Sequence, residues 1–122
     1  MASLAMLFPI LPGKTEEYIQ FGQQILKERG AAHRESRQQA GLTREQAFLQ
    51  STPMGDMAII YLEGADPLAA MQHIAMSPAP FDVWFRSRVL AIHGVDVAAP
   101  PPGPPPRQTV DWAADSLIST SK

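Results

Sequence analysis

The feature that most constrains the fold is a predicted β-hairpin between two helical segments. Residues 44–51 and 57–63 alternate in hydropathy, and the turn-forming residues 52–56 (TPMGD) separate them. Antiparallel strands joined by so short a turn need a hydrophobic layer on at least one face, which amphipathic helices can supply. The hairpin and its flanking segments therefore predict an α+β fold.

The segment before the hairpin, residues 15–40, predicts one long amphipathic helix. Thr15 is a plausible N-cap, and Gly41 is a natural left-handed stop. At about 100° per residue, one face of this helix is largely apolar. The residues that form this inward face are Tyr18, Phe21, Gly22, Ile25, Leu26 and Ala32.

Polar residues interrupt the second half of that apolar face. Arg29 and Ser36 fall at its centre, and His33 lies beside them. Gly30 is a weak point in a helix, so we expect a bend there. A helix that buries aromatic side chains in one half and cations in the other is expected to line a cavity, which indicates a small-molecule site.

The remaining elements complete a βαββαβ order. Residues 4–10 predict a strand, and a helix begins at Asp66-Pro67 and ends near residue 77. A second helical segment covers residues 81–93, and residues 109–112 predict a short last strand. We therefore expect a ferredoxin-like fold, an antiparallel sheet with helices on one face.

Three regions follow from this order: a domain over residues 1–97, a proline-rich strap over 98–106, and a strand and tail over 107–122. Trp112 is unexpected in a solvated tail, so we expect it to dock on its own subunit or on a neighbour. The second face of the sheet should also carry apolar residues, which predicts a homodimer whose sheets face each other. The residues expected on that face are Leu7, Ala47, Leu49, Ala58, Ile60 and Leu62.

Composition excludes several classes of function. The net charge of −2 argues against a nucleic-acid binder, and the absence of cysteine excludes disulfides and thiolate metal sites. No apolar run is long enough to span a bilayer. The apolar start lacks a basic region and ends at Pro9, so we expect no signal peptide and a cytoplasmic protein without membrane partners.

His33 and Arg29 are the first candidates for catalysis. His33 could act as a general base, donate a hydrogen bond to a substrate oxygen or ligate haem, or it could simply bond a backbone carbonyl. Arg29 could bind a carboxylate or an enolate, or pair structurally with an acid such as Glu63. Arg88 interrupts the apolar face of the last helix in the same way, and two inward arginines would suit an anionic ligand.

Further candidates lie on the hairpin and in the last helix. Tyr61 is a third catalytic candidate that could polarise a carbonyl, unless it packs across the strands on Phe48. The expected substrate-binding residues are Ser36, Gln46, Gln50, Trp84, Phe85 and Arg88. His93 is expected to cap a helix C-terminus and His73 to be exposed. We expect no metal and no cofactor, because the three histidines lie on separate elements.

Several stretches carry a family resemblance that covers residues 4–112. They are residues 11–14 (LPGK), 41–45 (GLTRE), 48–50 (FLQ), 55–56 (GD), 61–63 (YLE), 81–85 (FDVWF), 93–96 (HGVD) and 111–112 (DW). With them the chain resembles the dimeric α/β-barrel superfamily and, more narrowly, a small bacterial single-domain family of unknown function.

The resemblance implies a homodimer with a pocket between the sheet and the helices of each subunit. The superfamily includes cofactor-free monooxygenases, polyketide cyclases, isomerases and haem enzymes, as well as proteins without known catalysis. We therefore expect a small-molecule-binding protein, with cofactor-independent chemistry on an anionic or aromatic substrate as its enzymatic form. The alternatives are a non-catalytic binding or structural protein and a haem-binding barrel. Fold resemblance alone does not assign function.

Overall fold

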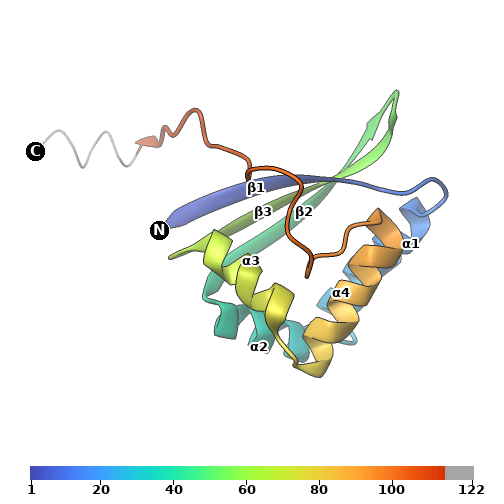
Figure 1. Cartoon of the computed structure of the whole chain (residues 1–122), viewed down its shortest axis with the longest axis horizontal. Coiled ribbons are helices and arrows are strands. Elements are labelled where there is room, and N and C mark those ends of the chain that lie inside the picture. The colour runs from blue at the N-terminus through green and yellow to red at the C-terminus, as the bar shows by residue number, and fades with distance from the viewer. Residues whose placement is uncertain (115–122) are drawn as a thin grey trace, which may run out of the picture.

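The computed structural model describes residues 1–114 and shows one antiparallel sheet with four helices packed against it (Figure 1). The α+β class predicted from the hairpin is therefore confirmed. In chain order the elements are β1 (Ala2–Pro9), α1 (Thr15–Leu26), α2 (Gly30–Ala40), β2 (Leu42–Thr52), β3 (Gly55–Gly64), α3 (Pro67–Met76) and α4 (Pro80–His93).

The sheet has three strands in the described residues, in the order β1-β3-β2. The predicted hairpin is present as β2 and β3, which are longer than expected and pair from Leu42 to Thr52. Across the sheet, Met6 pairs with Ile60 and Ile60 with Ala47. Because side chains alternate along a strand, this register fixes which residues face the helices.

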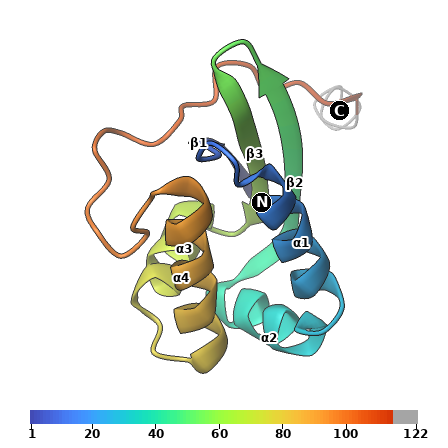
Figure 2. The same ribbon diagram turned by 90° about the vertical axis from the view of Figure 1, so that its right-hand side faces the viewer.

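The predicted last strand is absent from the described residues. Residues 109–112 form no ladder, and Trp112 is 68% exposed, so it does not dock on this chain. The chain beyond α4 runs past β1 (Figure 1 and Figure 2). Just after the strap, Gln108 Nε2 donates a hydrogen bond to Ser3 Oγ of β1 at 3.4 Å. Without a fourth strand, the full βαββαβ topology is not present in residues 1–114, and the rest of the predicted tail, 115–122, lies outside them.

The predicted long helix is two helices. α1 ends at Leu26, Lys27 departs from helical geometry with ψ of −86°, and α2 begins at Gly30. The Arg29 N–H donates to the carbonyl of Gln24, five residues back, which closes the break. The prediction of a bend near Gly30 was close. The prediction of a continuous inward face was wrong, because the break changes which residues of α2 face the core.

Most of the predictions made from residues at the helix ends are confirmed. Gly41 and Gly94 end α2 and α4 in the left-handed region, at φ of 86° and 69°. The Asp66 side chain caps α3 by accepting from the Ala69 N–H at 3.0 Å. Thr15, in contrast, is not an N-cap, and its hydroxyl donates to Asp56 at 2.6 Å.

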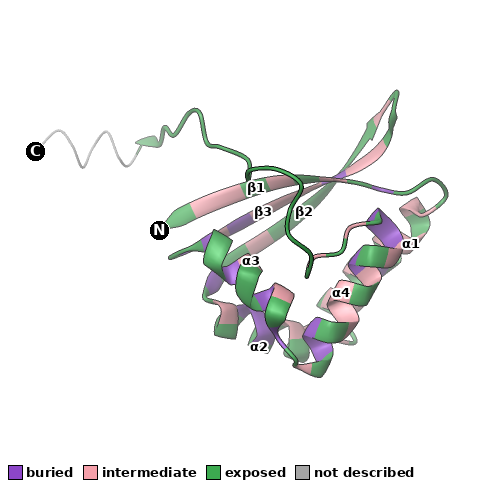
Figure 3. Cartoon of the chain, in the orientation of Figure 1, coloured by how far each residue is buried: buried purple, intermediate pink, exposed green. Residues whose placement is uncertain are grey.

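The core lies between the sheet and the helices in two clusters (Figure 3). One comprises Ile10, Phe21, Ala58, Val89 and Ile92. The other comprises Leu42, Leu62, Ala70 and Ile74. Figure 3 also shows the strap as exposed along its length. Among the described residues, no helix combines the length and the apolar character that a bilayer crossing requires.

Candidate functional site

An apolar cavity with a volume of about 280 Å³ lies between the sheet and the helices. Side chains from all three strands and all four helices surround it, and nearly all of them are apolar. Its lining includes Met6, Phe8, Tyr18, Phe21, Gly22, Ile25, Ala47, Leu49, Ile60, Leu62, Met71, Phe85 and Val89. The lining residues that carry polar groups are Tyr18, Arg37, Glu45 and His93.

Two small residues, Gly22 of α1 and Ala47 of β2, leave room between the larger side chains of the lining. Gly22 has no side chain, and a Cβ added there would meet no atom within 4 Å. Ala47 faces the same space from β2. Interiors are normally close-packed, so an apolar cavity of this size is a candidate binding site.

Arg37 and Glu45 form one wall of the cavity. They also line an open hollow on the outer side, between α2 and β2, together with His33. Glu45 accepts from Arg37 Nε at 2.8 Å, and its Oε1 lies 2.7 Å from His33 Nε2. The Arg37 guanidinium also lies over the Phe85 ring, 4.4 Å from its centroid. This ion pair therefore separates the apolar interior from the outer hollow.

The electrostatics of this wall keep Glu45 ionised. Burial alone would raise the pKa of the Glu45 carboxyl, but the hydrogen bonds and charges of His33 and Arg37 outweigh burial and lower it to about 2. Held between Arg37 and His33, the ionised Glu45 carboxylate stabilises the folded structure. It is not a proton donor at neutral pH.

The polar network continues from Arg37 into the core. Ser36 accepts from Arg37 Nη1 at 2.9 Å and donates to Asp82 Oδ1 at 2.5 Å. Arg37 Nη1 also lies 3.8 Å from Asp82, which is 2% exposed. Every one of these buried polar groups has a hydrogen-bond partner, and these bonds offset the desolvation cost of burying charge.

The structure places the predicted polar residues of the 15–40 segment around this network rather than in the cavity. His33 and Ser36 belong to it through Glu45 and Asp82. Arg29 is at the helix break, with its guanidinium 4.0 Å from the Trp84 ring centroid, and it does not pair with Glu63. Arg37, rather than Arg29, is the inward arginine of this segment.

The predicted residues of the last helix divide between the cavity and the surface. Phe85 lines the cavity, whereas Trp84 packs between Arg29 and the aromatic rings of Phe21 and Phe81. Arg88 donates to Glu17 Oε2 at 2.6 Å. This bond from Arg88, with a second from Lys14, lowers the pKa of the Glu17 carboxyl.

Tyr61, Gln46 and Gln50 lie on the sheet face that points away from the helices. Gln46 pairs with Tyr61 in the register, on the face opposite Ala47 and Ile60. The Tyr61 hydroxyl donates to Glu63 Oε2 at 2.5 Å, and this hydrogen bond raises the pKa of Tyr61. The expectation that the three side chains converge on the cavity was wrong, because the alternation of the strands puts them on the other face.

His93 is the last residue of α4, as expected, but its burial and its contact with the cavity were not predicted from the sequence. It is 5% exposed and lines the cavity, and its Nδ1 lies 2.7 Å from the carbonyl oxygen of Pro9. Burial lowers the pKa of the imidazole, against the raising effect of that hydrogen bond. The available signal was its spacing of four and eight residues from Val89 and Phe85, which puts all three on one helix face.

No cluster of three or more histidine, aspartate or glutamate side chains in residues 1–114 is arranged to hold a metal ion. His33, the residue considered for haem, has its Nε2 in contact with Glu45. Ligation of iron by this atom would require that contact to break. His73 is exposed, as expected.

Comparisons with known proteins do not place this chain in a family. No family model, no curated protein and no solved structure matches it.

Proposed function

We propose that this chain is a small-molecule-binding protein whose site is the apolar cavity between the sheet and the helices. The observation that carries the proposal is a space of about 280 Å³ with an almost entirely apolar lining. Ligand pockets are typically about 300–1,000 Å³, so this one suits a ligand of one or two rings. Apolar burial supplies the affinity, and the few polar groups supply the orientation.

The charges at the cavity wall favour a neutral aromatic ligand over an anionic one. The Arg37 guanidinium is already compensated by Glu45 at 2.8 Å and lies 3.8 Å from Asp82. An anionic ligand would have to displace Glu45 and leave that carboxylate unpaired, which is costly at a partly buried site. Among the substrate classes expected from the sequence, the aromatic one therefore fits the cavity better.

The same geometry favours binding over catalysis by the residues first considered. His33 and Arg29 do not line the cavity, and Tyr61 lies on the opposite face of the sheet. A general base must come within hydrogen-bond reach of its substrate. A cofactor-independent enzyme in this cavity would have to use other groups.

The test of this proposal is a cavity-filling substitution at Gly22. Gly22→Leu adds an apolar side chain where a Cβ meets nothing within 4 Å, and Gly22→Ala is the matched control that leaves most of the cavity open. Binding of a panel of small aromatic molecules is measured by calorimetry and by thermal shift. We expect saturable binding to the native protein and to Gly22→Ala, and a loss of roughly tenfold or more in Gly22→Leu. Binding that is equal in all three proteins places the ligand elsewhere and overturns the proposal.

A homodimer through the outer face of the sheet is part of the proposed function, in the form of a dimeric α/β barrel. Leu7 and Phe48 flank Ile59 in register across the three strands, and they are 59% and 51% exposed. This apolar row differs from the predicted one, since of the six residues expected on this face only Leu7 lies there. Arg44 and Glu63 lie 3.6 Å apart at the end of the same face, so a second copy turned by a two-fold axis would meet complementary charges.

The dimer would also give the C-terminal segment a partner. β1 is an edge strand among the described residues, with unpaired backbone groups, and Gln108, just after the strap, already bonds to Ser3 of β1. Residues 109–112 would then form the fourth strand of the ferredoxin-like fold once two copies assemble, with Trp112 covered at the interface.

Two substitutions of equal exposure test the dimer. Phe48→Lys places a charge in the apolar row, and Leu90→Lys does the same on α4, where Leu90 is 50% exposed. Light scattering coupled to size exclusion should show a dimer for the native protein and for Leu90→Lys, and a monomer for Phe48→Lys. A native protein that is monomeric at micromolar concentration contradicts this assembly.

A further inference from the structure

His93 lines the cavity, and one of its two ring nitrogens is a hydrogen-bond acceptor. Its Nδ1 lies 2.7 Å from the Pro9 carbonyl oxygen, which can only accept, so Nδ1 carries the proton of the neutral ring. The second ring nitrogen, Nε2, is then left with a lone pair. His93 can reach Pro9 because α4 ends beside the connection between β1 and α1 (Figure 2).

The Nε2 atom has no hydrogen-bond partner among the described residues, whose hydrogen bonds to His93 involve Nδ1 alone. Every fully buried side-chain nitrogen or oxygen in the same residues does have a partner. Nε2 therefore retains accessible surface, although the residue as a whole is only 5% exposed. The ring lines the cavity, and its neighbours Phe8 and Tyr18, at 5.7 and 5.6 Å between centroids, line it as well.

Tyr18 lines the cavity beside His93, with 5.6 Å between the two ring centroids, and its hydroxyl is a hydrogen-bond donor. No described residue makes a hydrogen bond with its hydroxyl, and burial raises the pKa of this phenol, so it stays protonated. The apolar cavity thus has one acceptor and one donor on adjacent rings, and α1 and α4 hold both of them. The Arg37–Glu45 wall, in contrast, has its hydrogen-bonding groups satisfied.

We propose that His93 Nε2 and the Tyr18 hydroxyl bind a hydroxyl group on an aromatic ligand, so that the preferred ligand class is the phenols. The ligand O–H donates to His93, and its oxygen accepts from Tyr18. An aromatic ligand without the hydroxyl leaves both groups unsatisfied in an apolar space, and an unsatisfied buried polar group is costly. This inference rests on the proposed function, because it assigns a ligand class to the same cavity.

The test compares p-cresol with p-xylene, which replaces the hydroxyl by a methyl group of similar size. Dissociation constants are measured by NMR titration for the native protein and three variants. His93→Asn retains a side-chain N–H that can reach the Pro9 carbonyl and removes the imidazole acceptor. Tyr18→Phe removes only the hydroxyl, and His73→Asn is the control at an exposed histidine of α3.

We expect the native protein and His73→Asn to prefer p-cresol by roughly 10- to 100-fold. The preference should fall to about threefold or less in His93→Asn, and by an intermediate amount in Tyr18→Phe. If both molecules bind the native protein equally, the His93 inference is overturned and the proposed function stands. If neither binds, both are overturned.

A measurement on the ligand-free protein keeps the inference testable if His93→Asn does not fold. The nitrogen chemical shifts of the imidazole report its tautomer directly. The proposal requires the proton of His93 on Nδ1 at neutral pH, and an upfield shift of Nε2 when p-cresol is added. A proton on Nε2 in the free protein contradicts it.

Discussion

Replacement of Glu45 by glutamine tests the electrostatic account of the cavity wall. Glu45 accepts from Arg37 at 2.8 Å and lies 2.7 Å from His33, and its pKa falls from 4.5 to about 2 in spite of burial. At about 1.4 kcal/mol per pKa unit, this lowering corresponds to about 3 kcal/mol of stability at neutral pH. Glu45→Gln removes that contribution and leaves Arg37, which is 6% exposed, without its nearest carboxylate.

The pH dependence gives the sign of the effect. A carboxyl group whose pKa is lower in the folded state stabilises the protein above the unfolded pKa, and this contribution is lost as the pH falls toward the folded pKa. The stability difference between the native protein and Glu45→Gln should therefore be about 3 kcal/mol at pH 7. It should shrink progressively as the pH falls from about 5 toward 2.

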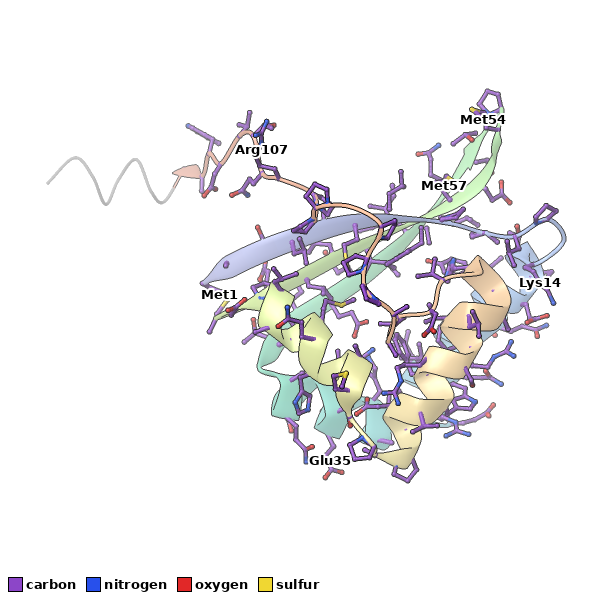
Figure 4. The ribbon with its side chains drawn as sticks, in the orientation of Figure 1. Met1, Lys14, Glu35, Met54, Met57 and Arg107 are labelled. Atoms are coloured by element: carbon purple, nitrogen blue, oxygen red, sulfur yellow. The ribbon has the colours of Figure 1, made fainter. Side chains whose placement is uncertain are left out.

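The assay is urea unfolding at a series of pH values, followed by circular dichroism. Glu35→Gln is the control, because Glu35 is exposed at the middle of α2 and its side chain, among the described residues, hydrogen-bonds only Gln39 (Figure 4). We expect this control to change stability by less than about 0.5 kcal/mol. A difference between the native protein and Glu45→Gln that is small at pH 7, or constant from pH 7 to acid, would refute the reasoning.

Three further predictions concern single positions. Gly64→Ala should destabilise the protein by about 1–3 kcal/mol, because a Cβ would lie 2.5 Å from the Gly41 carbonyl oxygen; a neutral result in urea unfolding would show that the α2–β2 connection moves freely. Ser36→Ala should cost about 1–3 kcal/mol, because it leaves Asp82 and Arg37 short of a partner. Ser87→Ala, which removes an exposed bond to the Trp84 carbonyl, is its control, and equal losses in the two variants would contradict the buried network. Trp112→Ala should change the stability of the monomer by less than about 0.5 kcal/mol, since Trp112 is 68% exposed; a larger loss in chemical denaturation of a monomeric form would show that the segment docks on its own chain.

Local signals predicted much of the fold. The hairpin, the Asp66 cap and the glycine stops at Gly41 and Gly94 depend on a few adjacent residues, and all of them are present. The prediction of a last strand at residues 109–112 was wrong, because a strand forms only when another backbone pairs with it. In residues 1–114 the chain offers residues 109–112 no such ladder.

The site was predicted less well, because it depends on which face of each helix and strand points to the core. The 15–40 segment was treated as one helix, and the break at Lys27 changed the phase of everything after it. Arg37 therefore faces the core where Arg29 was expected. Period alone shows that alternating residues share a face and does not show which face is buried. Tyr61 was therefore assigned to the cavity, although the register puts Ile60 there.

The missed contacts join residues far apart in the chain. His93 reaches the Pro9 carbonyl, and Ser36 reaches Asp82. No spacing rule within one helix predicts such pairs. The polar interruption and the family resemblance predicted a pocket lined by Arg29, His33 and Ser36, and none of these three residues lines the cavity between the sheet and the helices.

The most direct test of the central claim is a titration of the methionine methyl groups by NMR. The chain has six methionines, of which Met6 and Met71 line the cavity. Met54, at the hairpin tip, and Met76 are 97% and 76% exposed (Figure 4). With ¹³C-methyl methionine and increasing p-cresol, the resonances of Met6 and Met71 should shift saturably with one dissociation constant, while those of Met54 and Met76 stay in place. Shifts that are linear and similar at all four positions, or absent from Met6 and Met71, would contradict a binding site in the cavity.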